Sequence, residues 1–282
     1  MNKTKFLQFF IISCIFNLCP LHAQSNMPAD STLAFFPGVY RDIKTGLSDG
    51  VKLITAPASF DQKDWIITAG IIGGTALSFL ADTNIRNGIH NHHTKGMNNF
   101  TDIGKYYGNG LYPAILGGLI YFSGKAMKNN DVASTGRMMI ESLVYAGIIT
   151  TILKVSLGRS RPYMNEGNTH FLGFQLNNDN MSFPSGHVTV AFAVSSVLAA
   201  KIDNVYASVF LFGLAGLTAF QRIYEDQHWF SDTVFAATVS TIVGRAIVNY
   251  DEDREKERNG SSISFYPVIQ SHGLGLGAAY SF

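Results

Sequence analysis

Long apolar segments dominate the middle of the sequence and limit the folds that it can adopt. Six of them lie between residues 65 and 250, separated by polar connections: 66–80, 111–124, 139–153, 188–200, 205–220 and 234–248. Most run for roughly 13–17 residues, which is the length of an ordinary globular helix. No internal repeat relates them. The pattern therefore predicts an all-α, multi-helix bundle with about six core helices.

The lengths and charges of these segments do not decide whether the bundle lies in a membrane or in water. A helix that crosses a bilayer upright needs about 20 apolar residues, and Glu141 and Arg245 interrupt two of the segments. Both points favour the buried core of a soluble bundle. Segment 205–220, however, has no charged residue and is apolar around its whole circumference, which a half-solvated helix would not be. We expect a membrane-embedded bundle, with a soluble bundle as the alternative.

The charge composition argues against one class of partner. Charged residues make up 15% of the chain, against a typical quarter. There are 21 Lys and Arg residues and 20 Asp and Glu residues, which gives a net charge of +1. Such a balanced chain lacks the strong positive field that attracts polyanions. We therefore expect no nucleic-acid partner.

The first 23 residues have the pattern of a secretory signal peptide. Lys3 and Lys5 precede an apolar stretch, and the segment ends on Leu-His-Ala with Ala23 as the last residue before cleavage. The alternative is an uncleaved membrane anchor. The signal predicts an exported N-terminus and a location in the cell envelope.

Neither the cysteines nor the histidine cluster is expected to provide a set of metal ligands. Both cysteines, Cys14 and Cys19, lie inside the predicted signal peptide, so its removal leaves no disulfide and no thiolate ligand. His90, His92 and His93 are close in sequence, but a helix would bring at most two of the rings together. We expect no metal site.

The C-terminal end differs from the rest of the chain. A charged run, 251–258, is followed by a Gly-rich stretch with partial alternation that ends on Phe282. This predicts one or two strands. A terminal aromatic residue is typical of outer-membrane barrel strands, but one hairpin cannot close a barrel. We expect a tail that packs on the body or mediates outer-membrane contact or self-association.

The first of three polar patches ends the third apolar segment. Lys154 and Arg161 are seven residues apart, or two helical turns, so both can point toward one place. Arg159 points elsewhere by the same periodicity, and Pro162 stops the helix. The alternative is a basic helix end beside anionic lipid headgroups.

The second patch, 184–187, precedes the fourth apolar segment. Pro184 suits the first turn of a helix. Ser185 and Gly186 are expected to leave backbone N–H groups free at the positive end of the helix dipole, which is a typical anion site. His187 follows at the same rim. The alternative is an ordinary helix start that contains a histidine.

The third patch begins at the end of the fifth apolar segment. Arg222 is followed by His228 and Asp232, which are four residues apart and adjacent on a helix. A carboxylate on one imidazole nitrogen fixes the tautomer and leaves the other nitrogen basic. A nucleophilic histidine needs this arrangement. On its own, the pair is as easily structural.

Together the three patches resemble the type-2 phosphatidic acid phosphatase superfamily. Its pattern is K-x6-R-P, then P-S-G-H, then S-R-x5-H-x3-D, and all three blocks occur here in order and with the same internal spacings. The resemblance covers roughly residues 65–248. One position departs from the pattern: Gln221 stands where the family usually has Ser, which puts the hydrogen bonding around Arg222 in doubt.

The resemblance implies a role for each matched residue. His228, oriented by Asp232, attacks phosphorus and forms a phosphohistidine, while His187 protonates the leaving oxygen and later activates water. The implied phosphate-binding residues are Lys154, Arg161, Ser185, Gly186 and Arg222. No metal or other cofactor is implied, because the cations take the role that magnesium has in other phosphoryl transfers.

The predicted function is hydrolysis of a membrane-lipid phosphate. The candidate substrates are phosphatidate, phosphatidylglycerol phosphate, a polyprenyl diphosphate and a lipid A-type phosphate, with the site facing the periplasm. The alternatives are a secreted, soluble non-specific acid phosphatase, a non-catalytic membrane scaffold and a vanadate-dependent haloperoxidase.

The resemblance also suggests a division of the chain. The predicted parts are a signal peptide (1–23), an N-terminal extension (24–64), a helical phosphatase domain (65–250) and a charged linker with a strand-like tail (251–282).

Overall fold

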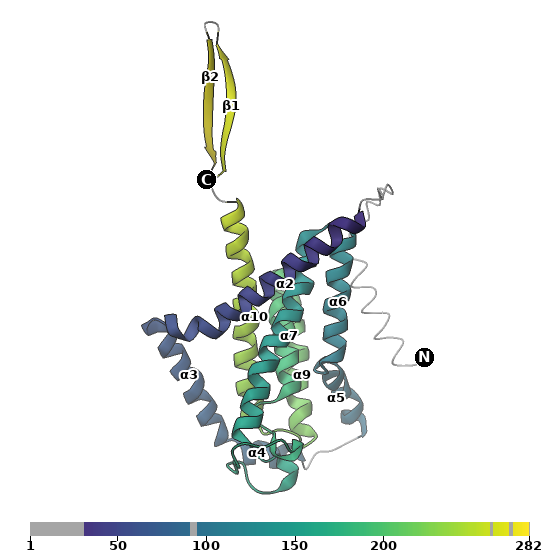
Figure 1. The fold of residues 1–282 in the computed structure, drawn as a ribbon. Helices are drawn as coiled ribbons and strands as arrows, with labels where there is room; N and C mark the ends of the chain where they lie inside the picture. Colours follow the sequence, from purple (N-terminus) through teal and green to yellow (C-terminus); the bar gives the residue numbers. More distant parts are fainter. Residues whose placement is uncertain (1–30, 91–94, 260–261, 271–272, 282) are drawn as a thin grey trace, which may run out of the picture. The chain divides into compact units, whose positions relative to one another are not determined.

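The computed structural model describes residues 31–90, 95–259, 262–270 and 273–281 (Figure 1), so the predicted signal peptide lies outside the described residues. The chain divides between Arg41 and Asp42 into two compact units, and the second contains all of the candidate site residues. The helices and strands are α2 (Ser31–Thr55), α3 (Gln62–Phe79), α4 (Asp82–His90), α5 (Lys95–Tyr107), α6 (Leu111–Ala126), α7 (Asn130–Leu157), α8 (Gly186–Ile202), α9 (Val205–Tyr224), α10 (Phe230–Asn259), β1 (Ser262–Gln270) and β2 (Gly273–Ser281).

The predicted all-α bundle is confirmed. Each of the six apolar segments falls in a helix, namely α3, α6, α7, α8, α9 and α10, and the first of them ends one residue beyond α3. The structure adds α2, α4 and α5, which the sequence pattern did not predict. The tail forms an antiparallel hairpin in which β1 pairs with β2 and Ser262 lies opposite Ser281. The predicted domain boundaries stay predictions.

The ends of the helices follow ordinary capping rules. The side chain of Asn129 accepts a hydrogen bond from an N–H of the first turn of α7, and that of Asn204 does the same for α9. Helix α7 stops at Gly158, which has a φ of 59°, in the left-handed region that glycine adopts without strain. The stop at Gly158 places Lys154 in the last turn of α7.

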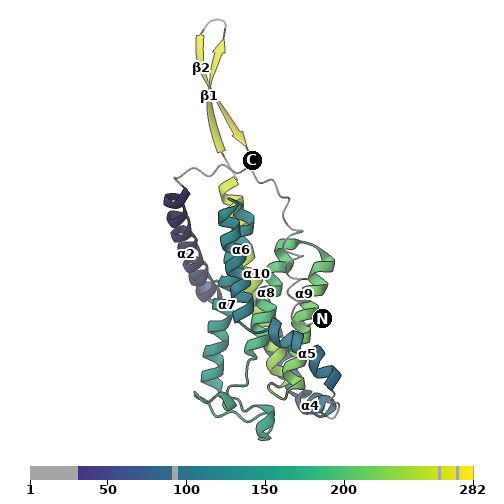
Figure 2. The same cartoon turned by 90° about the vertical axis from the view of Figure 1, so that its right-hand side faces the viewer.

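Helices α7, α8 and α10 lie side by side and share the main core (Figure 2). Helix α8 also packs on α9, and α6 packs on α7. The fully buried side chains of the core are Met138, Met139, Ala146, Ala193, Val194, Val197, Val243, Ile247 and Val248. This core joins three helices that carry Lys154, Gly186, His187 and Asp232.

Glycines allow α6 and α7 to approach closely. A Cβ atom at Gly136 would lie 2.3 Å from the backbone nitrogen of Tyr121, and one at Gly124 would lie 2.2 Å from that of Ala133. Neither position can hold a larger residue without moving a helix backbone. Small residues at such positions are typical of helix pairs in membranes.

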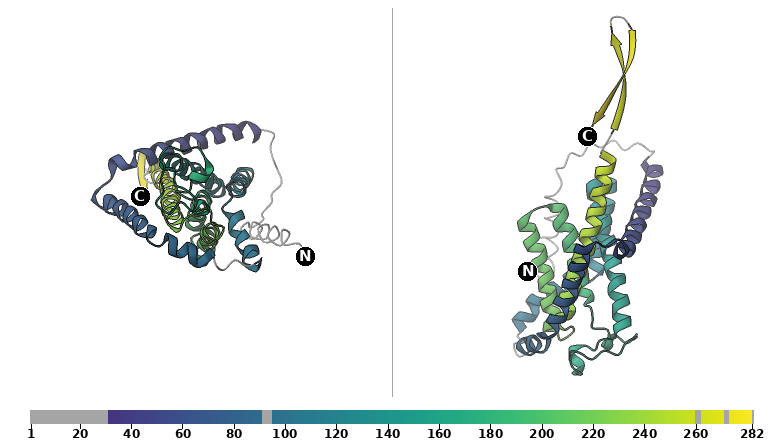
Figure 3. Two further views of the ribbon diagram at one scale, coloured as in Figure 1. Left: turned by 90° about the horizontal axis from the view of Figure 1, so that it is seen from below. Right: turned by 90° about the vertical axis from the view of Figure 1, so that its left-hand side faces the viewer.

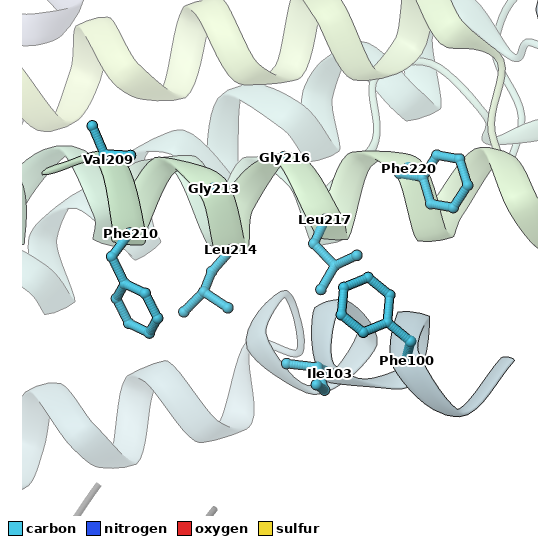
Figure 4. Close-up of a pocket in the computed structure, with 9 residues that line it drawn as sticks. All are labelled: Phe100, Ile103, Val209, Phe210, Gly213, Leu214, Gly216, Leu217 and Phe220. Carbon is cyan, nitrogen blue, oxygen red and sulfur yellow. The ribbon is translucent and has the colours of Figure 1, made fainter. Parts of the chain in front are cut away.

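An apolar groove separates the outer parts of α5 and α9 (Figure 4). Its volume is about 510 Å³. Helix α5 contributes Phe100 and Ile103, and α9 contributes Phe210, Leu214 and Phe220. None of the residues of the three sequence patches lines it. The groove is therefore separate from the candidate site.

Several helices are suited to a membrane. Helices α7, α9 and α10 are long and apolar enough to cross a bilayer, and α3 with α4 would make a fourth span, bent by 52°. One face of α7 exposes Ile140, Val144, Ile148 and Ile152, each four residues after the last. Such an exposed apolar stripe fits a lipid environment.

One end of the helices carries the polar connections. Helix α4, the connection from α7 to α8 and the turn from α9 to α10 all lie at this end (Figure 1, Figure 2 and Figure 3). Asn168, in the connection, donates a hydrogen bond to the carbonyl of Phe79 at 2.8 Å and so joins it to the end of α3. All three sequence patches fall at this end.

Candidate active site

The start of α8 forms an unusual helix N-terminus. Ser185 is the N-cap residue, yet its side chain does not cap the helix. Its Oγ atom is buried and has no hydrogen-bond partner among the described residues. An unpaired buried hydroxyl costs free energy unless a ligand completes it. The helix dipole beside it favours a negative ligand.

Lys154 reaches the same helix start. A Cβ atom at Gly186 would lie 3.7 Å from Cε of Lys154, so glycine leaves this approach open. The Nζ atom of Lys154 donates to the carbonyl oxygens of Met181 at 2.5 Å and Ser182 at 3.4 Å. The first and second sequence patches therefore meet.

The predicted free N–H at Ser185 is wrong. Its backbone nitrogen donates to the carbonyl of Asp232 at 3.2 Å, because the first turns of α8 and α10 are packed against each other. The N–H of Gly186, inside the first turn of α8, has no acceptor within the helix. Of the two expected backbone donors, only that of Gly186 remains for an anion.

The two arginines of the motifs are both buried at this end. Arg161 donates to Asn178 and, at 2.9 Å, to Oε1 of Gln227. Arg222 donates to Oε1 of Gln221 at 2.6 Å and contacts Glu225 at 3.2 Å. The departure at Gln221 thus alters the hydrogen bonding of Arg222, as expected, and it removes no charge.

His187 lies within electrostatic reach of all three cations. Its pKa falls from 6.5 to about 4 because the ring is largely buried and because Arg222, Lys154 and Arg161 act on it. Lys105 of α5 adds a fourth positive charge that the sequence patches did not include. Residues from α7, α8 and α9 therefore surround a single region.

His228 is buried in the turn before α10. Its Nδ1 atom lies 3.4 Å from Oδ2 of Asp232 and 3.5 Å from Oγ of Ser182. Burial lowers the pKa of His228 from 6.5 to about 3. The hydrogen bond to Asp232 opposes this shift, whereas the positive charges of Lys154 and Arg161 add to it. The ring is neutral at neutral pH, and Nε2 is the nitrogen not directed at Asp232.

Asp232 is held from several sides. Its Oδ2 atom accepts from the N–H of Trp229 at 2.9 Å and from the hydroxyl of Ser182. Its Oδ1 atom accepts from Arg159 at 2.5 Å. Because these donors occupy both oxygens, the carboxylate has one orientation toward His228.

Sequence reasoning missed part of this support. Helix α7 ends at Leu157, so the prediction that the helix continues to Pro162 is wrong, and helical spacing does not set the direction of Arg159. The side chain of Arg159 points at Asp232. Asp82 of α4 binds the other side of the same guanidinium at 2.6 Å. Asp82 lies 77 positions before Arg159 in sequence, and no spacing rule connects the two.

The aromatic residues next to the site have structural partners. Trp229 is 2% exposed and donates from Nε1 to the carbonyl of Ser160 at 2.9 Å. Tyr163 donates its hydroxyl hydrogen to Asp179 at 2.6 Å. The burial of Trp229 fits packing within the protein rather than contact with a lipid.

The fold and the site together define a helical bundle that gathers histidines and cations at one end. Residues 136–256 match the model of the PAP2 superfamily. The match spans α7 to α10 and all three motifs, whereas α4 and Asp82 lie outside it.

Individual relatives carry more specific names. A lipid A 1-phosphatase of Porphyromonas gingivalis is 27% identical over 267 residues, covering 86% of this chain and 50% of the relative. The chain thus spans about half the length of that relative. Two crystal structures are also similar.

LpxE of Aquifex aeolicus has a TM-score of 0.45 and 22% identity, covering 60% of this chain and 95% of that one. A PAP2-type phosphatidylglycerolphosphate phosphatase of Bacillus subtilis has a TM-score of 0.47 and 18% identity, covering 76% and 97%.

Proposed function

We propose that this protein is a metal-independent phosphatase that hydrolyses a phosphate monoester or diphosphate of a membrane lipid. The observation that carries the proposal is the unpartnered, buried hydroxyl of Ser185 at a helix N-terminus, beside Lys154 and close to two buried arginines. A tetrahedral phosphate would accept hydrogen bonds from all of these groups. The match of residues 136–256 to the PAP2 superfamily model supports the same assignment.

The first chemical step is transfer of the phosphoryl group to His228. Its Nδ1 atom faces Asp232, so Nε2 supplies the electron pair that forms the bond to phosphorus. The bond from phosphorus to the lipid oxygen breaks, and that oxygen takes a proton from His187. The products are the phosphohistidine, the dephosphorylated lipid and a neutral His187.

The second step restores the enzyme. Neutral His187 takes a proton from water, and the resulting hydroxide attacks phosphorus as the bond to Nε2 breaks. Inorganic phosphate leaves, and His187 is protonated again for the next cycle. The low pKa of His187, about 4 in the free site, arises partly from the surrounding cations. Bound phosphate offsets those charges and therefore raises the pKa toward the range in which His187 can donate.

A lipid substrate is supported by the apolar surface. The candidate site lies at the ends of helices whose outer faces expose aliphatic stripes, such as Val144, Ile148 and Ile152 on α7. A phosphorylated headgroup at the membrane surface would meet the site there. The name of the Porphyromonas gingivalis relative makes a lipid A-type phosphate the first of the candidate substrates to test. We place the site on the periplasmic side of an exported, membrane-embedded chain.

The test is a phosphate-release screen. The purified protein is incubated with phosphatidate, phosphatidylglycerol phosphate, a polyprenyl diphosphate and a lipid A-type glycolipid, without added metal. We expect release from at least one lipid, and loss of at least about a thousandfold with His228→Ala, because the nucleophile is absent.

His170→Ala is the matched control. His170 lies at the same end and contacts Glu166 at 3.0 Å, but it has no place in the proposed reaction. It should keep most of the activity. Full activity in His228→Ala, or no release from any lipid by the wild-type protein, would refute the proposal.

A further inference from the structure

A fully buried arginine joins α4 to the first turn of α10. The guanidinium of Arg159 donates to Oδ1 of Asp232 at 2.5 Å and to Oδ2 of Asp82 at 2.6 Å. It also lies over the ring of Phe79, 4.2 Å from the centroid. All three charged groups are fully buried or nearly so. Water therefore screens these charges little.

Asp82 makes two further contacts. Its Oδ1 atom accepts from the backbone N–H of Ser231 at 2.8 Å, and its Oδ2 atom accepts from the Ser231 hydroxyl at 2.8 Å. The carboxylate therefore caps the start of α10 from outside the helix. The residue that it caps is adjacent to Asp232. Any displacement of Asp82 would therefore also move Asp232, the partner of His228.

The directly paired charges of the cluster do not cancel. Asp82 and Asp232 together carry two negative charges, and Arg159, which pairs with both, carries one positive charge. Lys154 and Arg161 also act electrostatically on Asp232, but among the described residues neither forms an ion pair with it. His228, 3.4 Å from Asp232, is the contacting group that becomes positive in the proposed reaction. A buried charge of this kind is stable only when an opposite charge pairs with it.

The proposed reaction supplies that partner. When Nε2 of His228 forms its bond to phosphorus, the ring keeps the proton on Nδ1 and becomes a positively charged phosphoimidazolium. Electrons pass from the ring to phosphorus and from phosphorus to the leaving oxygen, which takes its proton from His187. The excess negative charge of the cluster then faces the new positive charge.

We propose that Asp82 is a positioning residue that, through Arg159 and Asp232, orients His228 and stabilises its phosphorylated form. This inference rests on the proposed function and adds to it an element that lies outside the matched region 136–256. Without Asp82, Arg159 would neutralise Asp232 alone, and the phosphorylated ring would lose its counter-charge.

The test compares two buried aspartates of similar surroundings. Asp82→Asn keeps the size of the side chain and removes its charge. Asp251→Asn is the control, because Asp251 is also buried beside arginines, Arg137 and Arg254. It lies nineteen residues along α10 from Asp232, which corresponds to about 28 Å. Both variants lose a buried ion pair, but only one is linked to His228.

The readouts are kcat, KM and the fraction of enzyme trapped as phosphohistidine by an alkaline quench with radiolabelled substrate. For Asp82→Asn we expect kcat to fall by about tenfold or more, as for partners behind metal-ligating side chains. KM should stay within about twofold, and the trapped fraction should fall. Asp251→Asn should change the melting temperature without changing the trapped fraction. Equal effects of the two variants would overturn the inference.

A second pair of variants separates charge from helix capping. Asp82→Glu keeps the charge. Ser231→Ala removes a hydroxyl that donates to Asp82 and accepts from Arg159 at 2.7 Å, but it leaves all three charges in place. Both variants should therefore keep more of the trapped fraction than Asp82→Asn. A fall in either one as large as in Asp82→Asn would overturn the inference. If Asp82→Asn does not fold, Asp82→Glu still tests the inference. Loss of the trapped fraction in Asp82→Glu would contradict a role for the charge of Asp82. A wild-type protein that releases no phosphate would refute the proposed function as well.

Discussion

The side chain of Gln221 controls the surroundings of Arg222. Its Oε1 atom accepts from Nε of Arg222 at 2.6 Å, whereas its Nε2 atom is buried without a partner among the described residues. The interaction holds the guanidinium in place and leaves its charge available. A neutral acceptor at this position is therefore compatible with phosphate binding, although the family usually has a serine there.

A charged acceptor should not be compatible. Gln221→Glu would place a carboxylate against Arg222 and compete with phosphate for the guanidinium. We expect KM for the lipid phosphate to rise by about tenfold, with a smaller change in kcat. Gln221→Ser, which restores the family residue, is the control and should stay within about threefold of the wild-type KM. A Gln221→Glu variant with unchanged KM would show that Arg222 does not bind the substrate.

Burial of His228 also makes the stability of the protein depend on pH. The pKa of His228 is about 3 in the folded protein and 6.5 as an ordinary value. Below pH 6.5 the unfolded chain takes up a proton that the folded protein refuses until about pH 3, so acid favours unfolding. This contribution is complete above pH 6.5 and is lost as the pH falls from 6.5 toward 3, at up to about 1.4 kcal/mol for each pH unit.

The measurement compares melting temperatures of wild type and His228→Asn in detergent at pH 7.5 and pH 4.5. The asparagine does not titrate, so the wild-type protein should lose more stability on acidification than the variant. Parallel losses in the two proteins would mean that His228 is protonated in the folded state at pH 4.5.

Individual residues of the site were predictable to different degrees. Lys154, Ser185 and His228 belong to short motifs with fixed spacing, and the fold brings these motifs to one end of the helices. The direction of Arg159 could not be predicted from helical periodicity, because α7 ends at Leu157. Asp82 could not be found, since its link to Arg159 depends on the packing of α4 on the loop after α7 and leaves no local pattern.

The contact between α6 and α7 depends on a glycine. Gly136 faces the backbone of Tyr121, whereas Gly147, on the same helix, has nothing within 4 Å of its Cβ position. Gly136→Ala should force the helices apart and cost about 1–3 kcal/mol. Gly147→Ala should be neutral or stabilising by up to about 1 kcal/mol, because alanine favours the helix.

Thermal unfolding in one detergent compares these two variants directly. Each carries the same substitution in α7, so their difference isolates the helix contact from helix propensity. Equal melting temperatures for Gly136→Ala and Gly147→Ala would contradict the close packing of α6 on α7.

Helices were predictable where their apolar faces are broad. All six apolar segments became helices because long apolar runs must be buried or placed in lipid, and a helix satisfies their backbone groups. Helices α4 and α5 were predicted only as polar connection, because their sequences, such as DTNIRNGIH, are polar on average. Their order depends on tertiary contacts, including the approach of Gly104 to the backbone of Leu217.

The distribution of apolar side chains decides between the two environments that the sequence left open. Buried positions of α7 include Met138 and Met139, while Val144 and Ile148 are each 49% exposed. A water-soluble bundle would place polar residues on that outer face. Together with the three candidate spans, the exposed stripe supports a membrane-embedded bundle over the soluble acid phosphatase.

Alkaline carbonate extraction tests this choice on the full chain. Carbonate releases proteins that are held at the membrane surface and leaves spanning helices in place, because exposing apolar stripes to water costs about 25 cal/mol for each square ångström. We therefore expect the chain to stay in the membrane pellet and to enter solution only with detergent, together with its phosphatase activity. Recovery of active protein in the carbonate supernatant would contradict the membrane assignment. The exposed faces of α7 and α9 would then have to be covered by a second copy of the chain.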